Sequence, residues 1–398
     1  MFLFIVTLLF CSSYYATENL RGSVLQLDNY THYLRELKEY SYNIVDSIEN
    51  AILDDDQFIR ESHVIHTLIV DTLIDKYETE INLENETDHW FKFNDFKNKY
   101  GKEYNSFDEF NYRFLIFKNN LRDIIKHNLE SIHNFKMKIN SFTDLSQYEF
   151  HDKYVLGIIN DVDTNLGTCK TFNYTNKPVP DELDWRLFNA VTPVKNQGQC
   201  GSCWSFSATG AIEGAYAIQN QILISFSEEQ LVDCSRLYGN SGCNGGLMDS
   251  AFKYTMVNGL CSEDEYPYTS SSGKTTYKCL NCEPIVKVRG CYDVSPNNQL
   301  ALKEAVSIGP VSVAIDADTR YFQSYSSGIL DLSDCNTNLD HGVLIVGYGV
   351  ENDTKYWLLK NSWGDSWGEK GYFRILRTDS QNDSGICGVA IQPSFPFV

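Results

Sequence analysis

The chain has 398 residues, of which 42% are hydrophobic and 14% aromatic, a composition typical of globular structure rather than disorder. This length predicts two or more structural units. The formal net charge of −20, with no compensating run of Lys or Arg, argues against a nucleic-acid-binding surface, so no nucleic-acid partner is expected.

The first ten residues form an apolar run, and small residues follow it as far as Ala16. We interpret residues 1–16 as a secretory signal peptide without a basic leader; the alternative is a buried strand or helix. The run is too short to cross a bilayer, and no other stretch approaches ~20 apolar residues. No stable membrane span is therefore expected.

Residues 17–86 form an acidic, helical-looking extension, with apolar residues such as Ile44, Ile48 and Ile52 at helical spacing. We find no chemistry in this extension and leave its role open. The next unit, residues 87–178, contains a long predicted helix. Glu109 and Arg113 in this helix can pair at i,i+4. Six residues recur at steps of three or four and share one face of it: Glu109, Arg113, Phe117, Asn120, Ile124 and Asn128.

Residues 160–177 are rich in Asp, Asn, Thr and Gly, which predicts an exposed linker open to proteolytic cutting. Behind the linker, residues 179–398 show helical signals first, at 203–219, at 299–307, and from a capping box at Ser227–Gln230 toward Cys234. Strand signals follow at 311–315, 342–346, 356–360 and 371–375. This order predicts an α+β fold of two lobes with a ligand cleft between them.

Ten of the 12 cysteines lie between Cys200 and Cys387, which in a secreted chain predicts disulfide bonds. Cys279 and Cys282 have the CxxC spacing of a zinc site. Neither a second CxxC nor a nearby His completes four ligands, so no metal or other cofactor is expected. Five Asn-x-Ser/Thr sequons fit a secreted glycoprotein: Asn29, Asn85, Asn173, Asn352 and Asn382.

Cys203 is the candidate nucleophile. It lies at the start of a predicted helix, where unpaired N–H groups and the helix dipole favour the thiolate. The alternative is that Cys203 forms half of a disulfide, although Cys200, three residues away, is an awkward partner. Of the eight histidines, only His341 lies beyond residue 151, so it is the one candidate base in the same unit.

Two amides and a tryptophan complete the candidate site. Asn361 ends a predicted strand and can accept a hydrogen bond from an imidazole N–H, which Trp363 can shield from water. Gln197 can supply one oxyanion donor through its side-chain amide, and the backbone N–H of Cys203 can supply the other. The alternative for each is an ordinary turn, core or loop residue.

The run Cys200-Gly-Ser-Cys203-Trp204, with His341 138 residues and Asn361 158 residues after Cys203, resembles the papain-like cysteine proteases. The stretches 243–248 and 309–316 are most similar to the cathepsin L branch. The resemblance implies a two-lobed catalytic domain over residues 179–398, with a helical left lobe and an antiparallel, β-barrel-like right lobe. It identifies residues 87–178 as an α-helical inhibitory propeptide and activation linker.

The propeptide resemblance rests on the six-residue helix face and on a second motif, Asn140-x-Phe142-x-Asp144, where Lys138 replaces the expected Gly. It implies that the chain's own propeptide is an intramolecular inhibitor that threads the cleft in a non-cleavable direction. Acidic pH is the expected trigger of its release, because protonated carboxylates would weaken charge pairs between propeptide and enzyme.

The family pattern implies three disulfides: Cys200–Cys243, Cys234–Cys279 and Cys335–Cys387. Three further cysteines of the unit remain, Cys261, Cys282 and Cys291, so at least one of them is free or pairs outside the unit, and Cys282 could replace Cys279. The pairing of Cys169 is also left open.

By position, the resemblance implies a set of substrate-binding residues. Gly246 would hydrogen-bond the substrate backbone. A pocket for the side chain two positions before the cut would favour Leu, Phe or Val, because four of its five residues are apolar. Gln392 replaces a small residue there and predicts a shallower pocket that tolerates polar side chains. The pocket residues are Leu247, Met248, Ala314, Leu339 and Gln392, and the full set adds Gly245, Gly246, Asp340 and Trp363.

These residues predict a monomeric cysteine endopeptidase made as an inactive precursor, which acts on protein or peptide substrates. The expected location is the secretory pathway, in a lysosome-like acidic compartment or outside the cell. Cutting near Lys177–Val179 would release a mature unit of about 220 residues. Two alternatives are a silent homologue that binds peptides and a transglutaminase-like acyl transferase.

Overall fold

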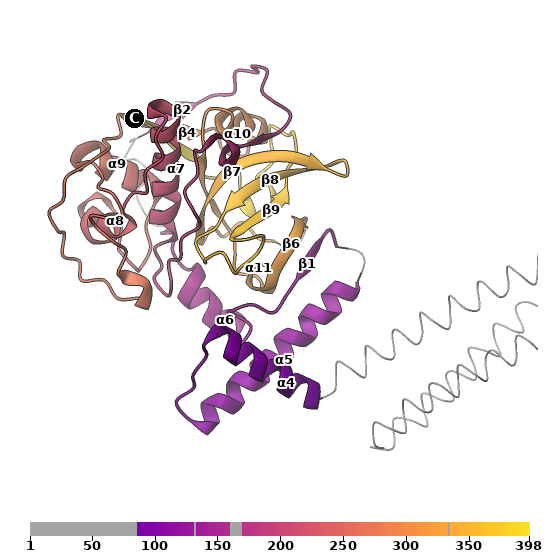
Figure 1. Ribbon diagram of the computed structural model, residues 1–398. Helices are drawn as coiled ribbons and strands as arrows, with labels where there is room; N and C mark the ends of the chain where they lie inside the picture. Colours follow the sequence, from indigo (N-terminus) through magenta and orange to yellow (C-terminus); the bar gives the residue numbers. More distant parts are fainter. Residues whose placement is uncertain (1–85, 131–132, 160–168, 333–334) are drawn as a thin grey trace, which may run out of the picture. The chain divides into compact units, whose positions relative to one another are not determined.

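The computed structural model describes residues 86–130, 133–159, 169–332 and 335–398. The predicted signal peptide, and the acidic extension up to residue 85, lie outside these residues. The description below concerns the compact unit His89–Val398, together with the first residues of its leading helix (Figure 1). Within the described ranges, no helix combines the length and the apolar character needed to cross a bilayer.

The predicted propeptide is built on two helices, α4 (Glu86–Tyr100) and α5 (Phe107–Leu129). The Ser106 hydroxyl starts α5 by accepting a hydrogen bond from the Glu109 N–H at 3.1 Å. Strand β1 (Phe135–Met137), helix α6 (Gln147–Phe150) and a π-helical turn, η1 (His151–Val155), follow (Figure 1). The two long helices are joined by a buried cluster of large side chains: Phe93, Phe96, Phe117 and Leu121.

The polar members of the six-residue face of α5 hold the chain that follows this helix. Asn120 Nδ2 donates to the Thr143 and Leu145 carbonyl oxygens at 2.8 and 2.9 Å. Asn128 binds both the N–H and the C=O of Met137 and thereby fixes β1. Ile124 is buried in the core of the sheet lobe. The amphipathic helix predicted from spacing is therefore confirmed. Its Asn120 and Asn128 side chains hold the following chain by hydrogen bonds.

Arg113 pairs with Glu149, so the predicted pairing of Arg113 with Glu109 is wrong. Arg113 Nη1 lies 2.9 Å from Glu149 Oε2 and 3.0 Å from the Asp144 carbonyl oxygen. Glu109 Oε2 instead accepts from the Asn105 N–H at 2.8 Å. The physical reason is tertiary: α6 presents a partly buried carboxylate to the guanidinium, whereas Glu109 satisfies the start of its own helix.

The second propeptide motif is also a set of polar clamps. Asn140 Nδ2 donates to the Gln323 carbonyl oxygen at 2.6 Å, and Asp144 accepts from Lys102 at 2.9 Å and from the Tyr104 hydroxyl at 3.0 Å. Phe142 is buried against the Trp363 ring, with the ring centres 5.7 Å apart. The non-family Lys138 extends its ammonium to the Gly368 carbonyl oxygen at 3.1 Å.

The helical lobe is organised around α7 (Cys203–Asn220), which is buried along most of its length. Before α7 come β3 (Leu183–Asp184) and η2 (Trp185–Phe188); after it come α8 (Glu228–Cys234), η3 (Ser235–Tyr238), α9 (Met248–Asn258) and η4 (Ser270–Ser272). The predicted capping box at α8 is only half formed. The Ser227 hydroxyl accepts from the Gln230 N–H, but the Gln230 side chain turns away to the Cys261 N–H.

The sheet lobe contains α10 (Gln299–Val306), α11 (Arg320–Ser324) and η5 (Ile386–Gly388) beside a ten-stranded sheet. Its strands are β4 (Gly290–Val294), β5 (Val311–Ile315), β6 (Tyr325–Leu330), β7 (His341–Glu351), β8 (Thr354–Lys360), β9 (Tyr372–Leu376) and β10 (Ser394–Phe397), joined by β1, β2 (Lys170–Phe172) and β3. The predicted α+β fold with helices first and strands second is confirmed.

The sheet is open, which corrects the prediction of a barrel-like lobe. The strand order runs β1-β6-β9-β8-β7-β5-β10-β4-β2, with β3 paired to β7, and does not close on itself. Strand β1 from the predicted propeptide covers one edge, and β2 from the predicted linker covers the other. The sheet therefore ends at β1 and β2, which belong to the predicted propeptide and linker, rather than at a strand of the predicted catalytic domain.

Part of the predicted linker is ordered structure, which is a second correction. Strand β2 pairs in parallel with β4, with Lys170 opposite Tyr292 and Phe172 opposite Val294. A disulfide joins Cys169 to Cys291 at the start of this pairing. A loop composition does not prevent strand pairing when a covalent bond holds the segment against a sheet edge. Residues 160–168 of the predicted linker lie outside the described residues.

Candidate active site

Cys203 is the first residue of α7 and is fully buried. Among the cysteines of the described ranges it is the one without a disulfide partner. Its Sγ accepts a hydrogen bond from the Gly342 N–H at 3.1 Å, which joins the start of α7 to the start of β7. The candidate thiol therefore lies where the two lobes meet.

His341 lies next to Gly342 at the first position of β7 and is buried. Its Nε2 lies 2.8 Å from Asn361 Oδ1, and the Trp363 ring stacks on the imidazole with centres 4.6 Å apart. Since Asn361 Oδ1 can only accept, the proton of the neutral ring is on Nε2. His341 Nδ1 makes no hydrogen bond to any described residue, so it is left as the basic nitrogen.

Burial keeps both groups neutral in this state. It raises the pKa of the Cys203 thiol to about 12, although hydrogen bonds such as that from Gly342 act to lower it. It lowers the pKa of His341 to about 4, against the opposing effect of the Asn361 hydrogen bond. The thiolate favoured by the helix start is therefore not formed here, because the site is closed off from water.

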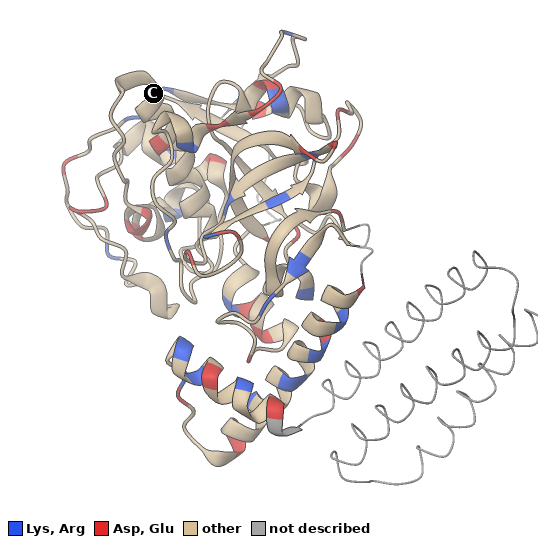
Figure 2. Ribbon diagram, turned by 45° about the vertical axis from the view of Figure 1, so that its right-hand side comes forward, with Lys and Arg blue, Asp and Glu red and all other residues tan. Residues whose placement is uncertain are grey.

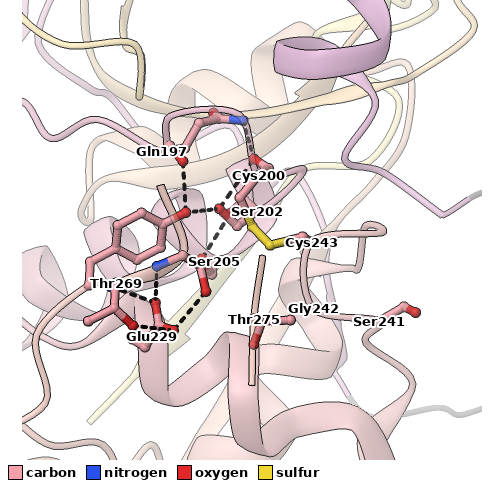
Figure 3. Close-up of a disulfide and its surroundings, with 12 residues drawn as sticks. Gln197, Cys200, Ser202, Ser205, Glu229, Ser241, Gly242, Cys243, Thr269 and Thr275 are labelled. Atoms are coloured by element: carbon pink, nitrogen blue, oxygen red, sulfur yellow. Dashed lines mark hydrogen bonds between the residues drawn. A yellow bond between two sulfur atoms is a disulfide. The ribbon is translucent and has the colours of Figure 1, made fainter. Parts of the chain in front are cut away.

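Gln197 is held from several directions. Its Oε1 accepts from the Ser362 hydroxyl at 2.6 Å, and its Nε2 donates to the Cys200 carbonyl oxygen at 3.0 Å. The Tyr268 hydroxyl donates to the Gln197 carbonyl oxygen at 2.8 Å and lies 2.8 Å from the Ser202 hydroxyl (Figure 3). Tyr268 therefore ties together both ends of the loop that precedes Cys203.

The end of the predicted propeptide covers this site. The Tyr154 carbonyl oxygen accepts from Gln197 Nε2 and from Trp363 Nε1, both at 3.2 Å. Gly157 lies directly on Cys203, and a Cβ at residue 157 would overlap Sγ. Ile158 then forms a parallel bridge with Gly246.

The predicted substrate-binding residues lie around this covering segment. Gly246 donates its N–H to the Gly157 carbonyl oxygen at 3.0 Å, and the Asp340 carbonyl oxygen accepts from the Gly157 N–H at 2.9 Å. A side chain at residue 246 would meet Asn240 at 2.5 Å and the Trp204 ring at 2.7 Å, so only Gly fits there. A side chain at residue 245 would press on Ile159 at 3.1 Å.

The Ile158 side chain is buried in one apolar cluster with Met248, Ala314 and Leu339, and Leu247 packs against the same cluster. The structure thus brings together the four apolar residues of the predicted pocket. Gln392 is exposed and lies outside this cluster, and its neighbour Ile391 packs there instead.

Asp340 is a buried carboxyl beside the catalytic candidates. Its Oδ1 accepts from the Ala317 N–H at 2.8 Å, and Oδ2 lies 3.7 Å from His151 Nε2 of η1. Burial, with the nearby Asp316 and Asp318 charges, raises the pKa of Asp340 to about 8. Its side chain therefore faces the covering segment rather than an open pocket.

Five disulfides hold the described chain. Three join the pairs that the resemblance implies, Cys200–Cys243, Cys234–Cys279 and Cys335–Cys387, and the first lies beside Ser202 (Figure 3). The others are Cys261–Cys282 and Cys169–Cys291. Of the alternatives left open by the sequence, Cys291 therefore pairs outside the unit that starts at residue 179, and Cys282 does not replace Cys279.

Sequence reasoning missed the residues that cover the site, namely Tyr154, Gly157 and Ile158, and the tie made by Tyr268. The only available signal for the first group was the run Gly157-Ile158-Ile159 immediately before the linker. A small residue followed by branched apolar ones is too common to identify an active-site cover by itself.

Comparison with known proteins gives a family match for both parts of this unit, the propeptide region and the two lobes. Residues 179–397 match the model of the papain family cysteine proteases, and residues 93–150 match the cathepsin propeptide inhibitor domain. Germination-specific cysteine protease 1 of Arabidopsis thaliana is 46% identical over 292 residues, which cover 71% of this chain and 77% of that protein. A cathepsin L-like proteinase of Fasciola hepatica is 42% identical over 308 residues, which cover 76% of this chain and 91% of that protein.

Solved structures agree with these matches. Digestive procathepsin L 3 from the larval midgut of Tenebrio molitor has a TM-score of 0.71 and 41% sequence identity, covering 78% of this chain and 99% of that one. The recombinant stem bromelain precursor has a TM-score of 0.68 and 37% sequence identity, covering 78% of this chain and 99% of that one. The first of these structures is a procathepsin and the second a precursor.

The contact between Gly157 and Cys203 gives a direct test of the cover. Gly157→Ala forces a methyl group into the space of Sγ, and overpacking of this kind costs about 1–3 kcal/mol. We expect the rate at which iodoacetamide alkylates Cys203 in the intact chain to rise about tenfold or more, as followed by mass spectrometry. Gly309→Ala is the matched control, since its methyl meets only the flexible end of Ile218 at 3.2 Å. Equal alkylation rates in the two variants would contradict this account.

Proposed function

The chain belongs to the papain family of cysteine proteases, and from that premise we propose that it is an endopeptidase held inactive by its own propeptide. The observation that carries the proposal is the set of three groups at the junction of the lobes. A buried thiol, Cys203, has no disulfide partner among the described cysteines, and it accepts a hydrogen bond from the N–H of Gly342, the residue that follows His341. The ring of His341 is oriented by Asn361 so that its basic nitrogen carries no other hydrogen bond.

Release of the propeptide would let water reach this pair and remove the burial that holds both groups neutral. The proton of Cys203 then passes to His341 Nδ1, which gives a thiolate beside an imidazolium. Asn361 keeps its hydrogen bond to Nε2 in both states. The proton stays within the pair, so the net charge of the site is unchanged and only its distribution differs.

The reaction follows in two halves. Cys203 Sγ bonds to the substrate carbonyl carbon, and the carbonyl oxygen becomes an oxyanion near Gln197 Nε2 and the Cys203 N–H. The C–N bond breaks as His341 gives its proton to the leaving amine, and a thioester remains. His341 then takes a proton from water, the hydroxide bonds to the carbonyl carbon, and the C–S bond breaks to regenerate the thiolate.

The direction of the propeptide supports its role as an inhibitor rather than a substrate. Ile158 forms a parallel bridge with Gly246, and the Tyr154 carbonyl oxygen accepts a hydrogen bond from the Gln197 side-chain amide. A substrate that runs antiparallel to Gly246 would place its scissile carbonyl at Cys203. The propeptide runs the other way, so its backbone meets the thiol in an orientation that does not lead to cleavage.

The pocket that Ile158 fills would receive the substrate side chain two positions before the cut. Met248, Ala314 and Leu339 are apolar and buried with it, so a branched aliphatic or aromatic side chain is favoured. Gln392 is exposed and outside this cluster; the resemblance gives it a position beside the pocket, from which it would tolerate a polar substituent.

Acid would act chiefly on the fold of the propeptide itself. Between propeptide and enzyme, the ion pairs of the described residues are Arg320–Asp123, which is exposed at 3.3 Å, and His151–Asp340 at 3.7 Å. The better-shielded pairs, Lys102–Asp144 and Arg113–Glu149, lie within the propeptide, whose helices carry both acidic and basic residues (Figure 2). We also propose, from the resemblance, that the enzyme is a monomer and that it acts in an acidic compartment of the secretory pathway or outside the cell.

Burial raises the pKa of Glu149, but hydrogen bonds from Arg113 and Ser146 outweigh this effect and hold the pKa below its ordinary value. A carboxyl group of this kind stabilises the fold above its ordinary pKa, near 4.5, and the stabilisation is lost as the pH falls through the lowered value. Acid thus loosens α6 from α5, and with α6 the segment that covers Cys203.

Cys203→Ser tests the mechanism. The full-length chain is treated with acid, and hydrolysis of a dipeptidyl amide is followed beside the unchanged protein. Because a hydroxyl at this position is far less acidic than a thiol, we expect activity to fall by at least about 10³-fold. The fold, followed by circular dichroism, is expected to be unchanged. Equal hydrolysis by the variant would overturn the mechanism, and transfer to added amines that outpaces hydrolysis would favour an acyl transferase.

A peptide library that varies the residue two positions before the cut tests the pocket. We expect Ile, Leu, Val and Phe to be cleaved fastest, with polar residues cleaved more slowly but measurably. In Gln392→Ala we expect kcat/KM to fall several-fold more for peptides with a polar residue at this position than for peptides with an apolar one. Strict rejection of polar residues by the unchanged enzyme would count against the assigned role of Gln392.

Glu149→Gln tests the acid response. The substitution removes the charge that Arg113 pairs with, so the propeptide is weakened at every pH and its release should begin at a higher pH. We expect the midpoint of activation against pH to move upward, with several-fold faster activation between pH 5 and 6. Glu103→Gln, at an exposed position, is the control and should leave the midpoint in place. A profile for Glu149→Gln that coincides with the control would show that the pair has no part in activation.

A further inference from the structure

Residues 169–178 are attached to the peptidase lobes by a covalent bond and a sheet edge. Cys169 is bonded to Cys291 in β4, 122 residues further along the chain. Directly after it, β2 pairs in parallel with β4 over three residues. These residues precede the region that matches the papain family, which begins at residue 179.

The attachment continues past the strand. The Ser295 N–H and hydroxyl both donate to the Phe172 carbonyl oxygen, at 3.2 and 3.1 Å. The Phe172 ring packs on Phe395 with centres 5.5 Å apart. The Thr175 N–H donates to Glu304 Oε2 at 2.9 Å, and its hydroxyl binds the other carboxylate oxygen. The segment thus contacts the lobes from Cys169 to Thr175, with strand register over Lys170–Phe172.

The disulfide also lies over a pair of carboxyl groups. The Cys169 sulfur, Asp249 and Asp293 lie within 4.8 Å of one another. Burial, together with Asp249, raises the pKa of Asp293 to about 7, and burial raises that of Asp249. Because the Cys169 sulfur is already bonded to Cys291, it offers no thiolate to a metal ion. At this point the segment therefore covers the two carboxyl groups and does not contribute a metal ligand.

The inhibitory contacts end before this segment. Tyr154, Gly157 and Ile158 occupy the cleft, whereas Cys169 to Thr175 contact β4, α9, β10, α10 and the turn before α10. Inhibition and attachment are therefore carried by different stretches of the chain.

We propose that residues 169–178 stay with the peptidase after activation, as its first strand, and that the cut which releases the inhibitor lies on the N-terminal side of Cys169. A cut near Lys177–Val179, as predicted from the sequence, would not release the inhibitor, because Cys169–Cys291 would still link the propeptide to the lobes. This inference rests on the proposed function in one respect, namely that activation requires loss of the propeptide.

The first test is the N-terminus of the activated enzyme. The full-length chain is activated with acid, and its mass is measured with and without reductant, together with N-terminal sequencing. We expect the mature chain to begin before Cys169 and to lose no peptide on reduction. A mature chain that begins at residues 177–180 and lacks residues 169–176 would overturn the proposal.

A second test uses a recognition site for factor Xa inserted after Lys177 in the full-length chain. After cutting, we expect one species on a denaturing gel without reductant and two species with it, and no gain of peptidase activity in the absence of reductant. The same insertion in a Cys169→Ser, Cys291→Ser chain is the matched control and should give two species in both lanes. Two species from the disulfide-bearing chain without reductant would contradict the linkage.

A third measurement separates this inference from the proposed function. Cys203→Ser cannot process itself if the mechanism is right, so it is digested with pepsin at acid pH. We expect the resistant core to begin before Cys169 whether or not the unchanged protein hydrolyses peptides. A core that begins at residue 179 would reject the retained strand while leaving the peptidase assignment intact.

Discussion

The exclusion of water from one sulfur and one imidazole is the constraint on which the rest of this structure depends. Cys203 and His341 are both buried, and burial alone moves their pKa values far enough to hold the pair neutral. The exclusion is achieved by main chain rather than by a large side chain. At Gly157 the covering segment lies so close to Sγ that no β-carbon fits. Inhibition therefore requires a glycine at this position and a backbone that is held on both sides.

Hydrogen bonds at successive points along the chain hold the covering segment in place. The carbonyl oxygen of Tyr154 is fixed by Gln197 and Trp363, and the carbonyl oxygen of Asp340 fixes the N–H of Gly157. Upstream, Arg113 holds Glu149, and Asn120 holds the turn before α6. The helices α4 and α5 are thus remote from the thiol but determine whether it is covered. Loss of any one of these hydrogen bonds would lower the fraction of molecules in which the segment covers the thiol. It would leave the catalytic groups themselves unchanged.

Much of this could be predicted from the sequence, because periodicity and composition report local structure. The helix that begins at Cys203, the strand at His341 and the α+β order all follow from apolar spacing, and Cys203 and His341 are singled out by type and position. The choice of partners could not be predicted in the same way. Arg113 has Glu109 at the favourable spacing but binds Glu149, because α6 folds back against it. Cys169 lies in a stretch with the composition of a linker, and only the fold shows that Cys291 is near.

Strand β1 has a consequence for the mature enzyme that goes beyond inhibition. It pairs with β6 through Phe135, Lys136 and Met137, so loss of the propeptide takes away a strand as well as a cover. The two borders of the sheet then differ: under the proposal above β4 keeps β2, whereas β6 loses the strand that pairs with it from Tyr325 to Gly328. Such a border is a template onto which another extended chain can assemble. Gly328, with a φ of 95°, interrupts the regular strand geometry of β6. This irregularity limits the straight length of β6 on which a foreign strand could stack.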